Sequence, residues 1–388
     1  MLGSVTVSEV QSSKDRREFL QLPWTIYKDD PHWIPPLLAT HLGLIGFKKD
    51  AYYIRNKVQT FLARRDGVVV GRIAAILNQG HLDLYKDNRG FFGFFECMDD
   101  QEAANALFDA ARDWLKGLGI KNIRGPMNPS MNHEVGLLVD GFHNAPMFMM
   151  TYNPPYYERL VTEYGFKKAH DMYAFVGYID MLPKFLDRYL PFSEQIKERF
   201  NVKIRPLDTK HLDQDIQTFM DVYNRSITNT WGYVPMSPEE VEQEAAGLKL
   251  LLVPELCSLA EIDGKVVGCL LCLPDYNPVI RQIKGRLFPF GFLRLLMSKR
   301  KIQSIRIIST NVLPEYQMCG LPLPLLHALL PAARKAKIQK AEFSWVLESN
   351  GFSRGSLEKA GTKREKTYRV YDFDGDQAPE QTSEQESA

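Results

Sequence analysis

Two patterns alternate along the chain. Short runs of apolar and β-branched residues follow stretches in which apolar residues recur every three or four positions. Residues 59–65 and 68–77 flank an Asp-Gly pair, which predicts a β-hairpin. Residues 101–118 place their apolar side chains on one face, which predicts an amphipathic helix ending at Gly119. The same periodicities predict a strand at 122–124, a helix at 154–164 and a strand at 168–178.

The second half of the chain repeats this order of elements. The segment DGVVVG at 66–71 returns as DGKVVG at 263–268. A predicted helix at 183–199 joins the two passes, and strands at 305–310, 341–347 and 365–373 complete the second one. We therefore predict an α/β (α+β) protein with two similar domains in tandem, each a mixed, mostly antiparallel twisted sheet flanked by helices.

The repeat also sets the expected boundaries. We expect an N-terminal domain at 1–180, a linking helix at 181–200 and a C-terminal domain at 201–374. Residues 375–388 are rich in Gln, Ser and Glu and lack the apolar residues that a packed segment needs. We expect this tail to be disordered.

Composition narrows the class of protein. The chain has 388 residues, 45% of them hydrophobic and 24% charged, with a formal net charge of +1, so no overall positive field indicates nucleic acid. Its odd number of cysteines favours reduced thiols in a cytosol. Cys269 and Cys272 form one C-x-x-C pair without a second, so no metal site is expected. No signal peptide and no membrane-spanning stretch are expected either.

Residues 305–337 combine a β-branched strand, a polar turn and a helix with cations in its last turn. A tight loop at a helix N-terminus directs several backbone N–H groups toward one point, which suits a phosphate. The alternative is an ordinary strand–helix connection that binds no ligand.

Within this stretch, residues 312–321 (VLPEYQMCGL) resemble the acyl-CoA loop of the GNAT superfamily of N-acyltransferases. That motif has Gln or Arg, two residues, Gly, one residue, then Gly or Ala, after a V-x-P-x-Y lead-in. Gln317, Gly320 and the lead-in match, whereas Pro322 replaces the second Gly or Ala. The resemblance implies acyl-CoA (acetyl-CoA or a long-chain acyl-CoA) as co-substrate, with contacts from Asn311, Val312, Leu313, Gln317, Met318, Cys319, Gly320, Leu321 and Asn350. For Asn350 the alternative is a helix cap.

Amide formation from a thioester needs a base for the amine and a donor for the oxyanion. The resemblance puts the thioester in a gap between two splayed strands, and Glu348 at the end of the second strand is the favoured base. His133 and Glu134, in a loop rich in Asn and Pro, could reach the same gap if the domains face each other. The alternatives are a surface carboxylate for Glu348, and for the loop residues hydrogen bonds to their own backbone. In the N-terminal copy, residues 96–101 bring acids and no glycine to the corresponding helix start, so we expect no acyl-CoA site there.

Residues 281–301 are both basic and strongly apolar, and they are too short to cross a bilayer. Such a segment suits a lipid interface, with cations toward the headgroups and aromatic rings toward the acyl chains. The alternative is a flap packed on its own domain. We therefore expect a cytoplasmic protein with peripheral contact to the inner membrane through Arg281–Lys301.

Over nearly its whole length the chain resembles the YghO-type branch of bacterial tandem GNAT proteins, to which bacterial ceramide synthases are similar. The sequence segments on which this resemblance rests are residues 70–75, 125–128, 136–142 and 152–157. It implies transfer of a fatty acyl group from CoA, or from acyl carrier protein, to the amine of a lipid such as a sphingoid base. The alternatives are an enzyme acting on a soluble amine or peptide, and a scaffold that has lost its site.

Overall fold

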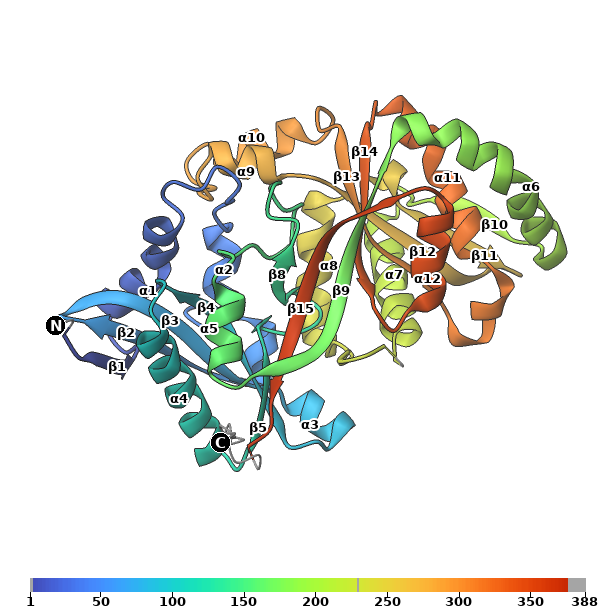
Figure 1. Ribbon diagram of the computed structural model, residues 1–388. Coiled ribbons are helices and arrows are strands. Elements are labelled where there is room, and N and C mark those ends of the chain that lie inside the picture. Colours follow the sequence, from blue (N-terminus) through green and yellow to red (C-terminus); the bar gives the residue numbers. More distant parts are fainter. Residues whose placement is uncertain (1–2, 229, 376–388) are drawn as a thin grey trace, which may run out of the picture.

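The computed structural model describes residues 3–228 and 230–375 (Figure 1). The N-terminal half contains both predicted hairpin strands and the amphipathic helix. Its helices are α1 (Ser13–Ile26), α2 (Leu38–Leu44), α3 (Gln79–Tyr85), α4 (Gln101–Gly117) and α5 (Tyr157–Glu163). Its strands are β1 (Val5–Glu9), β2 (Lys57–Arg65), β3 (Val68–Leu77), β4 (Arg89–Cys97), β5 (Asn122–Gly125), β6 (Met127–Asn128), β7 (Glu134–Val135), β8 (Leu137–Asp140) and β9 (Lys167–Tyr178).

The C-terminal half follows the long helix α6 (Leu182–Phe200) and repeats the same kinds of element. Its strands are β10 (Lys203–Pro206), β11 (Ser258–Ile262), β12 (Lys265–Pro274), β13 (Ser304–Val312), β14 (Lys340–Leu347) and β15 (Lys363–Phe373). Its helices are α7 (Leu212–Ser226), α8 (Pro238–Leu251), α9 (Asn277–Gln282), α10 (Gly291–Ser298), α11 (Pro322–Lys335) and α12 (Gly351–Lys359). Within the described residues, no helix combines the length and the apolar character needed to cross a bilayer.

One 13-stranded sheet runs through both halves, in the order β1-β2-β3-β4-β5-β15-β9-β14-β13-β12-β11-β10, with β8 paired to β15. The closing strands are exchanged. β15, from the end of the chain, pairs with β5 of the N-terminal half, and β9 pairs with β14 of the C-terminal half. Figure 1 shows β9 and β15 side by side between the halves. Because each half of the sheet contains a strand from the other half of the chain, the two halves cannot separate without breaking backbone hydrogen bonds.

The apolar pattern explains where the helices lie. α4 packs on β2 and β3, and its buried stripe is the face predicted from the sequence: Ala104, Leu107, Phe108, Ala111 and Leu115. In the C-terminal half, α7 packs on β12 and β13, and α11 packs across β10 to β13. Ser237 caps α8 with a reciprocal bond to Glu240, as its sequence indicates.

The predicted fold class is confirmed: the sheet is mixed and flanked by helices. The exchange of β9 and β15 was not predicted, because both strands follow a helix and a glycine in the same way and the pattern does not say which sheet each one joins. The boundaries at 180 and 200 stay predictions. All of the predicted tail beyond residue 375 lies outside the described residues.

Candidate active site

The two central strands of the C-terminal half diverge. β13 and β14 pair in parallel from Ser304 and Lys340 to Ile307 and Phe343, and the pairing stops there. Beyond that point β13 continues along β12 to Val312, while β14 continues along β9. The two strands thus splay apart in a V whose apex lies at the last of these pairs, as the resemblance to the GNAT superfamily implied.

The N-terminal half has the same divergence, but its own chain fills it. β4 and β5 pair only as far as Phe91 and Arg124. Beyond them, Asn128 of β6 accepts a hydrogen bond from the Phe94 N–H at 2.6 Å. A Cβ atom on Gly93 would lie 1.8 Å from the Met127 carbonyl oxygen, which shows how closely β6 crosses β4. The backbone of β6 therefore crosses the divergence between β4 and β5.

The predicted acyl-CoA loop forms a short 3-10 turn, Pro314–Cys319, that leads into α11. Gly320 sits between them with a φ of +73°, a left-handed conformation that favours glycine. Pro322 is in the first turn of α11, where a backbone N–H has no partner within the helix, so proline fits there. Leu321 points into the core and is fully buried, whereas the Met318 side chain is 98% exposed.

The end of β13 presents backbone groups to the gap. The Leu313 N–H donates to the Val267 carbonyl of β12 at 2.9 Å. Because N–H groups alternate in direction along a strand, the N–H of Val312 points away from β12 and toward the opening. The Gln317 side chain donates to the Val312 carbonyl oxygen at 3.3 Å, so it lies on the same side.

Ser226, the last residue of α7, borders this arm of the gap and was not predicted. Its carbonyl oxygen accepts from Gln317 at 3.2 Å, and its hydroxyl accepts from the Asn311 Nδ2 atom at 2.8 Å. The Oδ1 atom of Asn311 is buried and has no hydrogen-bond partner among the described residues. An unpaired buried acceptor here is a group that a bound ligand could satisfy.

Arg306 lies at the apex and is 2% exposed. Its guanidinium donates to the hydroxyl and carbonyl of Ser344 on β14, and to the carbonyl oxygens of Phe148 and Met149. It also lies over the Trp345 ring, 5.2 Å from the centroid. The sequence signal for Arg306 is its place within the apolar run of β13, because a charged side chain there needs buried hydrogen-bond partners.

The loop that contains His133 and Glu134 reaches from the N-terminal half into the C-terminal half. Asn132 donates to the Val234 carbonyl oxygen at 3.0 Å and accepts from the Tyr223 hydroxyl at 3.2 Å. Burial raises the pKa of Glu134 to about 7, although the positive charge of Arg306 at the apex opposes that rise. Glu134 therefore lies close enough to Arg306 for the two charges to interact, on a loop whose Asn132 contacts the C-terminal half.

His133 is held rather than free. Its Nδ1 atom lies 2.9 Å from the Ser130 hydroxyl, and its Nε2 atom lies 3.9 Å from a Glu244 carboxylate oxygen of α8. Burial lowers the pKa of His133 to about 4, so its ring is neutral at pH 7. Burial also raises the pKa of Glu244 to about 7, and Asp50 and Glu240 add to that rise.

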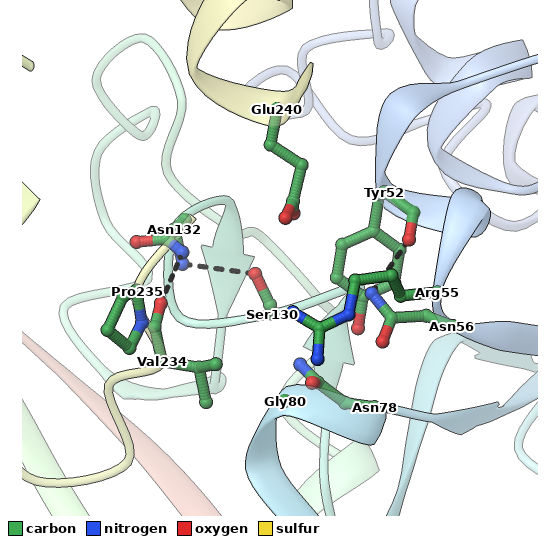
Figure 2. A pocket seen from close by; sticks show the side chains of 10 residues that line it. All are labelled: Tyr52, Arg55, Asn56, Asn78, Gly80, Ser130, Asn132, Val234, Pro235 and Glu240. Atoms are coloured by element: carbon green, nitrogen blue, oxygen red, sulfur yellow. Dashed lines mark hydrogen bonds between the residues drawn. The ribbon is translucent and has the colours of Figure 1, made fainter. Parts of the chain in front are cut away.

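A small polar cavity lies beside this loop (Figure 2). Its volume is about 20 Å³, which is room for one water molecule and not for a substrate. Figure 2 shows that Glu240 points into it from α8, opposite Arg55. Its lining residues come from both halves: Tyr52, Arg55, Asn56, Asn78, Gly80, Ser130, Asn132, Val234, Pro235 and Glu240.

Glu348 and Asn350 both have partners within the protein. The Glu348 carboxylate accepts from Lys168 at 2.8 Å and from the Asp171 N–H at 3.0 Å. Burial alone would raise the pKa of Glu348, but these two hydrogen bonds lower it below its usual value. Asn350 caps α12 by accepting from the Ser353 N–H at 3.0 Å, which is the alternative that its position allowed.

No family model matches the chain. Over 388 aligned residues it is 34% identical to a protein named bacterial ceramide synthase from Caulobacter vibrioides, covering 95% of this chain and 97% of that one. It is 31% identical to protein YghO of Escherichia coli K12, covering 93% of each. The chain belongs to this family of GNAT-fold N-acyltransferases.

Solved structures agree on the fold of this GNAT family member. A tandem GNAT protein from the clavulanic acid biosynthesis pathway matches 97% of this chain and all of its own, with a TM-score of 0.57 and 12% identity. A GCN5-related N-acetyltransferase from Sphaerobacter thermophilus matches 96% of this chain and 97% of its own, with a TM-score of 0.52 and 11% identity. The predicted family and tandem architecture are therefore confirmed.

No three His, Cys, Asp or Glu side chains gather as metal ligands in the part of the chain that the structure describes. Cys269 and Cys272 are both fully buried in the core of the C-terminal half. Burial raises the pKa of both thiols, which opposes the thiolate form that a metal requires.

Proposed function

We propose that this GNAT family member transfers a fatty acyl group from acyl-CoA to the amine of a lipid such as a sphingoid base. One observation carries the proposal. The gap between β13 and β14 is lined by unused polar groups and is approached by Glu134, whereas the matching gap in the N-terminal half is filled by β6. The relative named bacterial ceramide synthase supports the choice of acceptor.

The donor would lie along the edge of β13. The unpaired Oδ1 atom of Asn311 can accept a hydrogen bond from an amide of the pantetheine arm, and the Val312 N–H beside it would face the thioester carbonyl. The pyrophosphate would meet the N-terminus of α11, where Gly320 lets the chain turn and the helix dipole favours negative charge. Gln317, Met318, Cys319 and Leu321 complete this loop, although the buried Leu321 would contribute only its backbone.

Glu134 is our preferred general base. A base with a pKa near the working pH is largely deprotonated and can still hold the proton that it removes. Burial gives Glu134 that property, whereas the Glu348 carboxylate is already engaged by Lys168 and has a lowered pKa. Glu348 then positions the end of β14 rather than removing the proton.

The reaction balances on these groups. The amine nitrogen loses a proton to Glu134 and attacks the thioester carbonyl carbon, and the Val312 N–H stabilises the oxygen that becomes negative. The tetrahedral intermediate then collapses and the C–S bond breaks. The CoA thiolate leaves and takes up the second proton, which the nitrogen loses as the amide forms. His133 is a positioning residue: neutral and fixed by Ser130, it holds the loop that carries Glu134.

A lipid acceptor also implies a place at a membrane. The peripheral contact expected through residues 281–301, at the cytoplasmic face of the inner membrane, therefore belongs to the same proposal. Its support is the large exposed fraction of the apolar side chains there, among them Phe288 at 89% and Met297 at 70%.

The test is a transfer assay with three acceptors: a sphingoid base in mixed micelles, a soluble amino sugar and a short peptide, each with acetyl-CoA or a long-chain acyl-CoA. The proposal predicts N-acylated lipid from the long-chain donor, detected by mass spectrometry. Product only from a soluble amine would contradict the lipid acceptor. Absence of any product, together with no heat on titration of acyl-CoA, would identify a scaffold.

A further inference from the structure

The segment between β12 and β13 exposes an apolar tip. It consists of α9, a turn and α10, and Figure 1 shows it at the upper edge of the molecule. Ile280 and Leu295 fix it to the core of the C-terminal half. Five large apolar side chains nevertheless face solvent: Phe288 at 89%, Phe290 at 68%, Phe292 at 39%, Leu293 at 54% and Met297 at 70%. Such a concentration on one projection marks an interaction surface.

The charge of the same segment is of one sign. Residues 281–301 contain seven Lys and Arg and neither Asp nor Glu. Six of these cations are exposed, and none of the six makes an ion pair within residues 3–228 and 230–375: Arg281, Lys284, Arg286, Arg294, Arg300 and Lys301. Unpaired cations around exposed aromatic rings match a surface that is negative outside and apolar beneath, which is the surface of an anionic bilayer.

The base of the segment is fastened to the other half of the chain. The Leu38 N–H of α2 donates to the Gly285 carbonyl oxygen at 3.1 Å. The Asn277 side chain donates to the Pro146 carbonyl oxygen at 2.8 Å, and the Asp275 carboxylate accepts from the Phe148 N–H at 3.0 Å. The tip is therefore mounted on both halves, and it is not a loose flap.

Hydrogen bonds also connect the base of the segment with the gap between β13 and β14. The carbonyl oxygen of Phe148, whose N–H bonds Asp275, accepts from Arg306 at the apex at 3.1 Å. One residue thus connects the base of the exposed segment with the point where β13 and β14 diverge. A surface that fixed the tip would also fix the orientation of the gap.

We propose that residues 286–297 form a membrane-docking tip that inserts Phe288 and Phe290 into the headgroup region of an anionic phospholipid bilayer. Docking keeps the chain at the interface in which a lipid amine resides. This inference rests on the proposed function, because it names the surface from which that acceptor is drawn.

The experiment is co-sedimentation of the full chain with vesicles of phosphatidylcholine alone and of phosphatidylcholine with phosphatidylglycerol at 7:3. We expect the native protein to bind the anionic vesicles at least tenfold more tightly than the neutral ones. F288S/F290S and R286Q/R294Q/R300Q should each weaken that binding at least tenfold. F192S is the matched control, because Phe192 on α6 is 57% exposed but lies outside the tip, and it should bind as the native chain does.

Three results would overturn the docking tip: equal binding by F288S/F290S and the native chain, equal loss in F192S, or a native dimer that becomes a monomer in F288S/F290S without any vesicle binding.

Acyl-CoA calorimetry on the same variants separates the two proposals. If the native chain binds acyl-CoA but no vesicle, the tip and the membrane contact are refuted, and the proposed acyl transfer stands. If it binds vesicles but no acyl-CoA, the proposed function fails and the tip stands.

Discussion

Arg306 on β13 donates a hydrogen bond of 3.0 Å to the carbonyl oxygen of Met149, a residue of the opposite half of the chain. The same guanidinium holds Ser344 on β14. One side chain therefore fixes both strands of the gap and the segment of the N-terminal half that faces them. The candidate active site is therefore built by two halves that the exchanged strands β9 and β15 already hold together.

Removing the carboxylate of Glu134 should remove the base. We expect E134Q to lower kcat by ~10²–10⁴-fold, the usual contribution of a general base, with little change in the affinity for acyl-CoA. In the native protein kcat/KM should rise with pH and level off above about 7, because only the unprotonated carboxylate accepts a proton. E134Q should lose this dependence.

E348Q is the matched control for that experiment. Because Glu348 has a lowered pKa and bonds Lys168, its loss should leave the rise near pH 7 in place. A pH profile that is unchanged in E134Q and abolished in E348Q would assign the base to Glu348 instead.

A side chain at Gly320 should disrupt the acyl-CoA loop. Its φ is +73°, and a Cβ atom would lie 3.0 Å from the Cδ1 atom of Ile196 on α6. We expect G320V combined with Q317A to reduce acyl-CoA affinity by more than tenfold in calorimetry. G264V is the matched control, because Gly264 has a φ of +74° in a hairpin turn with nothing within 4 Å. Equal affinity in the native chain and the G320V/Q317A variant would refute the site.

Replacing Arg306 should destabilise the whole protein. R306M removes one of the cations that act on the buried Glu342, where Lys340 and Lys366 remain, and leaves the carbonyl oxygens of Phe148 and Met149 without their donor. Removing one partner of a buried charge network costs roughly 3–5 kcal/mol. S344A removes two hydrogen bonds of the Ser344 hydroxyl, one from Arg306 and one to the Glu342 carboxylate, and should cost about 2 kcal/mol. Equilibrium urea unfolding measures both, and a loss in R306M no larger than in S344A would contradict the role of Arg306 as the link.

The carboxyl of Glu244 should make stability depend on pH. Its pKa is raised to about 7 in the folded protein, so the protonated form is favoured there. The stability that this group contributes is fully present below its unfolded pKa of about 4.5 and is lost as pH rises through about 7. With the Glu244 side chain 33% exposed, solvent screening reduces the effect to roughly 1–2 kcal/mol. The free energy of unfolding of E244Q minus that of the native chain should therefore be larger at pH 8 than at pH 5. Urea unfolding measures it, and an equal difference at both pH values would contradict this.

The elements of this fold follow from local rules, and the sequence shows them. Asp-Gly turns, the apolar stripe of α4 and the serine cap of α8 act over a few residues, so their positions could be predicted. The exchange of β9 and β15 depends on which sheet edge each strand meets after the chain has crossed the molecule. Periodicity does not carry that information, because both strands alternate in the same way.

The candidate site likewise has parts that the local sequence predicts and parts that only the folded chain brings together. The loop around Gly320 has a sequence signature, whereas Ser226 borders the gap only because α7 ends there. The sequence favoured Glu348 over Glu134 as the base, because Glu348 ends the second strand of the gap. Their environments separate them: Lys168 lies beside one, and burial near Arg306 surrounds the other.

The central claim is that only the C-terminal half holds the thioester carrier. Hydrogen exchange, measured with and without a non-hydrolysable acyl-CoA analogue, tests it most directly. We predict slower exchange of the amides at 310–313 and 317–321, with no change at 93–98, at the end of β4 and just after it. Protection at 93–98, or none at 310–321 under saturating analogue, would contradict the account.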